Sequence, residues 1–567
     1  MSDPTVESRA GRLHTNATIW TADADRPTAS SLLVRDGVIT AIDPTPEELA
    51  GNEQIVDHGG AFLMPGFGDV HNHHLLAGRA SLVELQLDGN ADLDEVLASI
   101  AAWAEKLDDN AWVVGGGWGS HLLDAVSSLE ALDRLDEAAG GRAVMLRDDS
   151  CHNRWVSTRA MSLAGLTSDT EDPDGGRIVR VAPSSKPVGV LIEAALTPVE
   201  RAYAATQSDA TDLDAASCAH AIETLHSFGI THFQDAAASL PMMQALATLD
   251  GRGELRAWVV TSAQINDKIF GTSPVGMPLL DAAVRYRTEH HRPDFVKIFL
   301  DGVPTSRTAL LLEPYLPVES DDTEWFGEST MSQAELTEWL LEVARRGLGA
   351  KVHCTGDGSV RMVLDATAVI RDHGHADTVV QIAHGEYIAD DDLPRMATLG
   401  IIADLSPPLW FPGVILEAIC RCVPRDRARR MCPNRTLLDL GVVMAGGSDW
   451  PVMPSPDPWI GIQGLVTRAD PSGLHPGTLW PEQALTLDEA LHIYTIGVAK
   501  ATGLAAVTGS LAVGKSADFT ILNNNPFAVA SSDLVTLSSQ QTWFAGELVF
   551  GRHGSQHGHS RVTPSAV

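Results

Sequence analysis

The stretch MPGFGDVHNHH, residues 64–74, has the pattern of a short strand that follows a Pro-Gly break. Within it His71 and His73 stand two residues apart. Because side chains alternate across a strand, residues i and i+2 point to the same side, so the two imidazoles converge on one point. This spacing is typical of a metal site, and two histidines at chance spacing are the alternative. The polar residues that follow other strands decide between these readings.

Length and charge limit the class of protein. A chain of 567 residues exceeds one ordinary core, so we expect a large catalytic domain and at least one smaller unit. The net charge of −34 argues against binding to nucleic acid or to an anionic membrane. We expect a small-molecule substrate as the partner, and a homodimer is compatible with the sequence.

The location is predicted from the absence of two sequence signals and from the cysteines. The first residues lack a basic start followed by an apolar core, so no signal peptide is predicted. No run approaches the ~20 apolar residues of a membrane span. The six cysteines are scattered, which favours reduced thiols in the cytoplasm. Cys420, Cys422 and Cys432 fit no strong zinc template, so free thiols are expected there rather than a zinc site.

Both ends of the chain are rich in strand patterns. Residues 32–42 are predicted to form two strands joined at the Asp36-Gly37 turn, and similar patterns return at 509–522 and 541–550. We expect the two ends to pair into one small β domain. Between them, eight short apolar segments are each followed by helical or loop sequence, which predicts an α/β fold, a (β/α)₈ barrel with its site at the C-terminal ends of the strands. These segments lie near residues 66–71, 229–235, 255–263, 294–301, 349–354, 379–384, 399–405 and 441–449.

The interval between the first two strands is too long for one βα unit. We therefore expect an insertion at about residues 85–210, with helices around Leu93–Leu107 and Leu129–Gly140, that covers the barrel mouth. After Arg552 the chain is rich in Gly and Ser, and residues 553–567 are expected to be a flexible tail despite their three histidines.

Four more polar residues fall at the ends of predicted strands: Lys297, His353, His384 and Asp449. Lys297 is flanked by apolar residues, where a free ammonium is costly to bury, so it needs a partner or a changed chemical form. Each has a structural alternative, such as a hydrogen-bonded core histidine, a loop aspartate or a lysine whose head reaches water. Together with His71 and His73 at one end of a barrel, they favour a metal site.

The sequence resembles the amidohydrolase superfamily. More narrowly, it resembles the YtcJ-like, amidohydrolase-3 branch, which includes N-substituted formamide deformylases. The resemblance covers about residues 10–552. It rests on the motifs PGFGDVHNH (65–73), WVVGGGW (112–118), DGGRI (174–178), SRTA (306–309), HCTGD (353–357), GSD (447–449) and GSLAVGKSADF (509–519). It implies a distorted TIM barrel with a β-sandwich made from both termini. The implied domains are residues 1–64 plus 508–552 for the sandwich and 65–507 for the barrel.

The resemblance also implies the roles of the site residues. His71, His73 and Asp449 would hold one divalent ion, and His353 and His384 a second. Lys297 would bridge the two as its N-carboxylated form. Zinc is the default ion, while manganese, iron or nickel stay open, and a single-metal site is the fallback if Lys297 is not carboxylated.

The implied activity is hydrolysis of an amide-type C–N bond, in an N-formyl or N-acyl amine, by hydroxide generated at the metal, with Asp449 as the proton carrier. An esterase, lactonase or carbamate hydrolase is the alternative on the same site, and a non-catalytic metal-binding barrel is the alternative from another class. The candidate substrate contacts are His152, Arg307, Trp118 and Trp410, each with a structural alternative. Residues 149–152 read Asp-Ser-Cys-His where the family has Asp-Gly-His, which puts the shape of the pocket in question.

Overall fold

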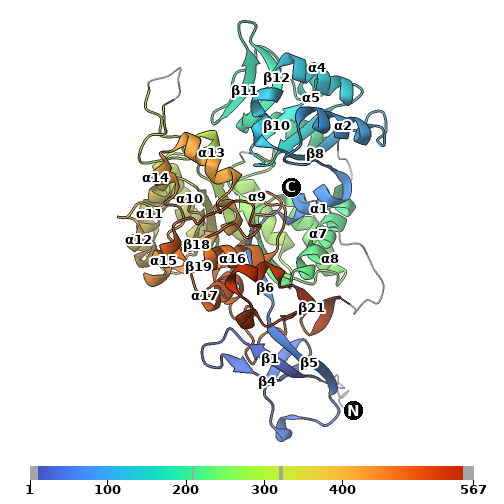
Figure 1. The fold of residues 1–567 in the computed structure, drawn as a ribbon, viewed down its shortest axis with the longest axis vertical. Coiled ribbons are helices and arrows are strands. Elements are labelled where there is room, and N and C mark those ends of the chain that lie inside the picture. Colours follow the sequence, from blue (N-terminus) through green and yellow to red (C-terminus); the bar gives the residue numbers. More distant parts are fainter. Residues whose placement is uncertain (1–10, 207–209, 268, 318–322, 553–567) are drawn as a thin grey trace.

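The computed structural model describes residues 11–552 except 207–209, 268 and 318–322, so the predicted tail at 553–567 lies outside the described residues. Figure 1 shows three regions along the long axis: a sheet formed by both ends of the chain, a barrel in the middle, and the insertion at the opposite end. Each region has its own apolar core.

The central region is a parallel barrel, and all eight predicted strands are confirmed. Neighbouring strands are hydrogen-bonded in one eight-stranded sheet, and a parallel bridge between Asn72 and Trp450 brings its last strand beside its first. The strands are β6 (Phe67–Asn72), β13 (Ile230–Ala238), β14 (Trp258–Gln264), β15 (His291–Phe299), β16 (Gly349–Cys354), β17 (Val380–His384), β18 (Ile401–Leu405) and β19 (Val443–Gly446). Nearly every residue of these strands is buried, as expected for a parallel sheet that closes on itself and is covered by helices.

Helices surround the barrel and are amphipathic where they pack on it. In α11, Val360, Val363, Leu364 and Ile370 form the buried stripe. The helix α10 begins at the Ser332 N-cap, with Glu335 completing a capping box. The helices of this layer are α1 (His74–Val83), α7 (Ala210–Ser227), α8 (Leu240–Gly251), α9 (Met277–Ala283), α10 (Gln333–Arg345), α11 (Asp357–Asp372), α12 (Leu393–Thr398), α13 (Val414–Cys422), α14 (Arg425–Ala428), α15 (Asn434–Asp439), α16 (Pro458–Thr467), α17 (Leu487–His492) and α18 (Val498–Ala501).

The two ends of the chain meet in a second sheet, as predicted. Strand β20 pairs antiparallel with β5, which runs directly towards β6 of the barrel. The predicted hairpin is present, with Asp36 and Gly37 at φ values of 48° and 79°, where a turn favours Gly. The strands are β1 (Arg12–Trp20), β2 (Thr28–Ala29), β3 (Leu32–Arg35), β4 (Val38–Ile42), β5 (Gln54–Pro65), β20 (Phe519–Leu522), β21 (Ser539–Phe544) and β22 (Glu547–Gly551).

The insertion contains the two predicted helices, α2 (Leu93–Ala104) and α4 (Leu129–Ala138), and also a six-stranded sheet that the sequence analysis missed. Most of its strands are short, and β8 contains three consecutive glycines, so a clear alternation of apolar and polar residues is lacking. The remaining elements are β7 (Leu85–Gln86), β8 (Val113–Trp118), α3 (Leu123–Val126), β9 (Val144–Asp148), β10 (Asn153–Val156), α5 (Thr158–Leu163), β11 (Gly176–Val181), β12 (Lys186–Glu193) and α6 (Thr197–Ala204).

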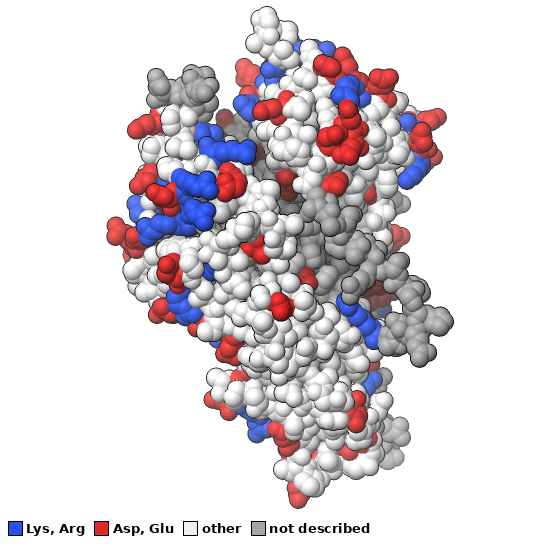
Figure 2. Space-filling view, viewed as in Figure 1, with Lys and Arg blue, Asp and Glu red and all other residues white. Residues whose placement is uncertain are grey.

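The surface matches the acidic composition. Figure 2 shows acidic side chains scattered over all three regions, whereas basic side chains gather over α13 and α14. All six cysteines are free, as expected. Among the described residues, no helix is both long and apolar enough to cross a membrane.

Candidate metal centre

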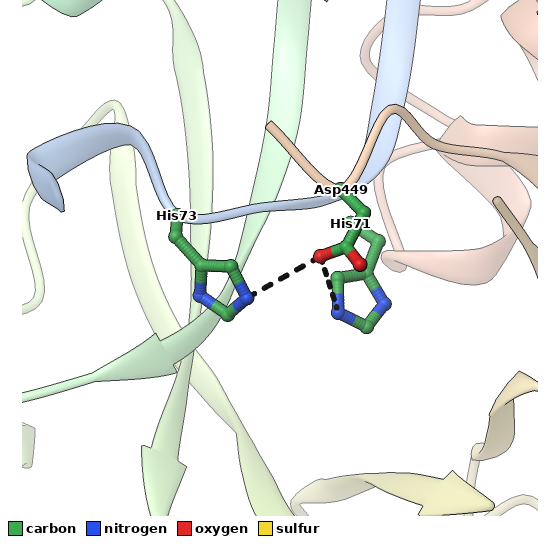
Figure 3. A group of neighbouring side chains, drawn as sticks. All are labelled: His71, His73 and Asp449. Atoms are coloured by element: carbon green, nitrogen blue, oxygen red, sulfur yellow. Dashed lines mark ion pairs between the residues drawn. The ribbon is translucent and has the colours of Figure 1, made fainter. Parts of the chain in front are cut away.

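Three side chains form a compact group at the C-terminal edge of the barrel. His71 lies in β6, His73 follows β6 as the N-cap of α1, and Asp449 follows β19. One ligand atom from each lies within 4.8 Å of the others, and all three residues are buried. Asp449 Oδ1 lies 3.7 Å from His71 Nε2 and 3.5 Å from His73 Nε2 (Figure 3). Two imidazole nitrogens and a carboxylate oxygen facing one point are a suitable ligand set for a divalent ion.

Backbone contacts between β6 and the loop after β19 hold this group together. The Asp449 amide donates to the His71 carbonyl at 2.7 Å. Asp69 accepts from the His71 amide at 3.0 Å and from the Ser448 hydroxyl at 2.6 Å. Asp449 itself has a φ of 56°, an uncommon conformation for a non-glycine residue that the surrounding contacts maintain. The strand pair therefore fixes the direction of the Asp449 side chain.

The other predicted ligands lie beside this group. The His384 ring is 4.7 Å from the His71 ring and 4.8 Å from the His353 ring, measured between centroids. Lys297 is 1% exposed, and its Nζ lies 4.8 Å from the centre of the Phe299 ring. The tertiary structure therefore brings all six predicted ligands to one end of the barrel, although they span residues 71 to 449.

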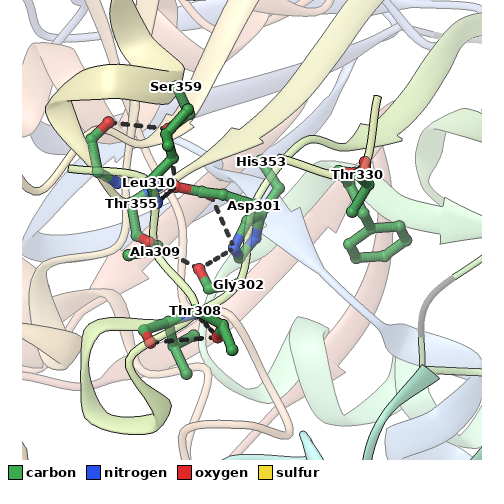
Figure 4. A network of polar contacts seen from close by, with 12 residues as sticks. Asp301, Gly302, Thr308, Ala309, Leu310, Thr330, His353, Thr355 and Ser359 are labelled. Carbon is green, nitrogen blue, oxygen red and sulfur yellow. Dashed lines mark hydrogen bonds and ion pairs between the residues drawn. The ribbon is translucent and has the colours of Figure 1, made fainter. Parts of the chain in front are cut away.

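Hydrogen bonds on the outer side of the histidines determine which ring nitrogen faces the site. His71 Nδ1 lies 2.9 Å from Asp404 Oδ2, so its Nε2 is the nitrogen towards Asp449. His353 Nε2 lies 3.0 Å from the Gly302 carbonyl oxygen, which leaves Nδ1 as its lone-pair nitrogen (Figure 4). Such outer contacts fix the tautomer and orientation of metal-binding histidines.

The pKa values favour the forms that bind metals. Burial, reinforced by neighbouring positive or histidine groups, lowers the pKa of His71, His353 and His384 well below the usual range, so the imidazoles are neutral. Burial and the neighbouring Lys351 lower the pKa of Lys297 to about 8. Neutral imidazoles and a partly neutral amine are the forms that a divalent ion and its bridging ligand require. The residues present therefore fit the expected metal centre.

Two charged residues in contact with the site were not predicted from the sequence. Lys351 on β16 forms a fully buried ion pair with Asp404 on β18, and Asp404 also contacts His71. Asp69 in the first strand was likewise not predicted to contact the site, although it accepts hydrogen bonds from the His71 amide and the Ser448 hydroxyl. The available signal was the one used for Lys297, a charged residue inside an apolar strand, because Lys351 and Asp404 both have this pattern.

The four candidate substrate contacts have different positions. The His152 ring lies 6.2 Å from the His353 ring, at the edge of the site. Trp410 is 2% exposed beneath the Arg468 guanidinium, at 4.0 Å, and its Nε1 has no hydrogen-bond partner within the described part of the chain. The candidate role of Trp410 stays a prediction.

Two of the four candidates make structural contacts, and their substrate roles stay predictions. Trp118 is fully buried in the core of the insertion, where its Nε1 donates to the Leu146 carbonyl at 3.1 Å. Arg307 donates to the Leu316 carbonyl at 2.7 Å and stacks over Tyr315, and it pairs with neither Asp301 nor Glu313 among the described ion pairs. A tryptophan in a glycine-rich strand and an arginine in a loop fit structural roles as well as functional ones, so sequence alone did not separate them.

Comparison with known proteins agrees with this geometry. Residues 54–550 match the model of the Amidohydrolase family. The chain is 28% identical to the N-substituted formamide deformylase of Arthrobacter pascens, over 95% of this chain and 98% of that protein. It is also 28% identical to the putative amidohydrolase YtcJ of Bacillus subtilis (strain 168), over 94% and 98% of the two chains. An uncharacterized metal-dependent hydrolase from Pyrococcus horikoshii OT3 has a similar fold, with a TM-score of 0.73, 23% identity and coverage of 92% and 99%.

Proposed function

The chain belongs to the amidohydrolase family, and from this premise we propose that it is a metal-dependent hydrolase that cleaves the C–N bond of an N-formyl or N-acyl amine. The observation that carries the proposal is the convergence of His71, His73 and Asp449 within 4.8 Å at the C-terminal edge of the barrel. Active sites of this fold lie at that edge. The N-substituted formamide deformylase relative supports the choice of an amide substrate.

In this proposal His71, His73 and Asp449 hold one divalent ion, and His353 and His384 hold a second. Zinc suits imidazole and carboxylate ligands, which makes it the first choice. A bound ion of this kind acidifies water and polarises a carbonyl group. The outer contacts of His71 and His353 keep their ligand nitrogens directed at the site.

Lys297 is the proposed bridge in its carboxylated form. A lysine amine must be neutral to react with carbon dioxide, and a pKa of about 8 leaves a larger neutral fraction at physiological pH than the ordinary value of 10.5 does. The resulting carbamate would be an anion with two oxygen atoms, which suits a site for divalent ions. It also replaces a buried ammonium that has no carboxylate within ion-pair distance among the described residues.

Asp449 is the proposed proton carrier. Its Oδ1 faces both imidazoles, which leaves Oδ2 to take the proton from the attacking water. Asp449 then returns this proton to the leaving nitrogen, because an amine anion is a very poor leaving group. The backbone contacts of Asp449 with β6 keep the carboxylate in the same place for both transfers.

We also propose a cytoplasmic location and a small-molecule substrate. Six free thiols suit a reducing compartment, and a net charge of −34 disfavours polyanionic partners.

The test is a metal assay combined with a substrate panel. The purified protein is expected to contain one or two divalent ions, and His71→Ala with His73→Ala is expected to lose at least one of them. A panel of N-formyl amines, N-acyl amines, esters, lactones and carbamates then identifies the scissile bond. Turnover of amides above esters supports the proposal. Ester or lactone turnover alone supports the alternative hydrolase, and bound metal without any turnover supports a non-catalytic barrel.

A further inference from the structure

We propose that His152, which the insertion supplies, determines substrate specificity by accepting a hydrogen bond from an N–H group beside the scissile carbonyl. This inference rests on the proposed function and narrows its substrates to secondary or primary amides. Tertiary amides and esters lack that N–H group.

His152 is held by a chain of contacts that joins the insertion to the barrel. It directly precedes β10, and Glu193 ends the neighbouring strand β12. His152 Nδ1 lies 2.9 Å from Glu193 Oε2. The Thr308 hydroxyl, from the loop after β15, donates to Glu193 Oε1 at 2.9 Å. Both ends of the Glu193 carboxylate are therefore engaged, one by the insertion and one by the barrel.

The same loop also contacts the metal-site residue His353. The Gly302 carbonyl accepts from the His353 ring, and the Gly302 amide donates to the Thr308 carbonyl at 3.1 Å (Figure 4). A Cβ at Gly302 would lie 2.0 Å from the Thr308 hydroxyl and 2.8 Å from Glu193 Oε1, so only glycine permits this close approach. The position of His152 is thus coupled to the site through contiguous short contacts.

Backbone strain occurs at the same junction. Glu193 has a φ of 51° and Arg307, next to Thr308, a φ of 61°. Non-glycine residues adopt this region rarely, and such strain collects where a side chain must be held in one direction. Here it directs the Glu193 carboxylate towards His152.

The contacts of Glu193 determine the tautomer of His152. An ionised carboxylate only accepts hydrogen bonds, and Glu193 already accepts one from Thr308. The proton on the His152 ring therefore sits on Nδ1, and in the neutral imidazole Nε2 is the acceptor. With the ring 6.2 Å from that of His353, Nε2 can meet a group on a substrate held at the metal site.

A buried acceptor discriminates strongly between an N–H and an N-methyl group. A site built to hydrogen-bond a substrate group rejects analogues that lack it, because its own polar atom is then left without a partner. We therefore expect the wild-type enzyme to prefer a secondary formamide over its N-methyl counterpart by about 10- to 100-fold in kcat/KM.

The first experiment compares three variants on this substrate pair, N-butylformamide and N-butyl-N-methylformamide. His152→Ala is expected to lose the preference, mainly through the secondary amide. Glu193→Gln offers a side-chain N–H to Nδ1, which moves the ring proton to Nε2 and should also remove the preference while keeping the ring in place. Thr308→Val is expected to reduce the preference by a smaller factor, about 3-fold.

The matched control is His290→Ala. His290 also pairs through Nδ1 with an aspartate, Asp250, at 2.8 Å, but it lies beside Trp258 and Phe544, away from the site. The His290→Ala substitution should leave the preference for the secondary formamide unchanged. Metal content and thermal unfolding of all variants exclude a general loss of structure as the cause.

A binding measurement separates this inference from the proposed function. N-butylurea and its fully N-methylated counterpart are titrated into wild type and His152→Ala by calorimetry. The wild type is expected to bind the N–H urea at least 10-fold more tightly, and the variant to bind both alike. Equal affinity of the wild type for the two ureas, or an unchanged preference in His152→Ala, overturns the inference. Absence of any amide turnover overturns the proposed function instead.

Discussion

Two adjacent layers of the barrel interior differ in whether their buried polar side chains are paired with one another. The layer at the C-terminal edge contains His71, His73, His353, His384, Asp449 and Lys297, and the Lys297 amine has no ion-pair partner among the described residues. In the layer beneath, Lys351 is paired with Asp404, and Gln381 donates to Gln234 at 3.0 Å.

The two layers differ most clearly in the pairing of their buried lysines, Lys297 and Lys351. Lys297 and Lys351 face each other in the register of β15 and β16, and both are almost completely buried. Asp404 forms an ion pair with Lys351, whereas among the described residues no carboxylate lies within ion-pair distance of Lys297. We interpret the buried polar groups that pair with one another as structural. Those that lack such a partner are the candidates for binding a ligand, because a buried polar group without a partner is costly.

The largest effect is expected from Asp449→Asn, which tests the catalytic layer. The amide keeps the shape of the side chain and an oxygen ligand, but it cannot carry a proton. We expect kcat to fall about 10³-fold while at least one bound metal ion is retained. Steady-state kinetics and elemental analysis on the same sample measure both quantities. Wild-type turnover in this variant would remove Asp449 from the proton transfer.

The two lysines are expected to respond in opposite ways to replacement by methionine. Lys351→Met leaves Asp404 buried without its partner and should lower the free energy of unfolding by about 3–5 kcal/mol. Lys297→Met removes an uncompensated amine and should raise the unfolding free energy of the metal-free protein by about 1–3 kcal/mol, although activity is lost. Denaturant unfolding of the metal-free wild type and of both variants measures these changes in unfolding free energy. Equal destabilisation by both changes would contradict the distinction between the layers.

The pH dependence of stability provides a third test, on metal-free protein kept free of carbon dioxide. The pKa of Lys297 is lowered from 10.5 to about 8 in the folded state. Below pH 8 the amine is protonated in both states, and the folded protein bears the full cost of burial. Between about pH 8 and 10.5 the unfolded state binds more protons, so stability should rise with pH, by an amount on the order of 3 kcal/mol.

Lys297→Met is the reference for this measurement, because the other titrating groups are common to both proteins. The difference in unfolding free energy between the two should shrink as the pH rises through this window. A difference that stays constant would show that Lys297 is not an uncompensated buried amine.

The smallest effect on activity is expected from Trp118→Phe. Trp118 lies in the core of the insertion, where the change removes one hydrogen bond to the Leu146 carbonyl. We expect a loss of about 1–2 kcal/mol in stability and a kcat/KM within about twofold of wild type. Thermal unfolding and kinetics distinguish this outcome from a substrate-binding role, which would raise KM without lowering stability.

The repeated pattern of apolar segments followed by polar residues was sufficient to predict much of this protein. All eight barrel strands, the Asp36-Gly37 hairpin and the pairing of the two ends follow from strand periodicity and turn chemistry, which are local properties of the chain. The approach of His71, His73 and Asp449 also followed, since the C-terminal ends of barrel strands meet at one edge, while the six-residue ligand set stays a prediction.

Only the tertiary structure determined how each side chain is used. Sequence placed Lys297 and Lys351 in equivalent surroundings, and the aspartate that distinguishes them comes from a strand more than 50 residues further along, as the Lys351–Asp404 separation of 53 shows. Sequence did not distinguish His152, Trp118 and Arg307, whereas packing places the His152 ring near that of His353, Trp118 in the core of the insertion and Arg307 against the Leu316 carbonyl. The physical reason is that secondary structure depends on neighbours along the chain, whereas the charge, tautomer and direction of a buried polar group depend on partners that only folding brings near.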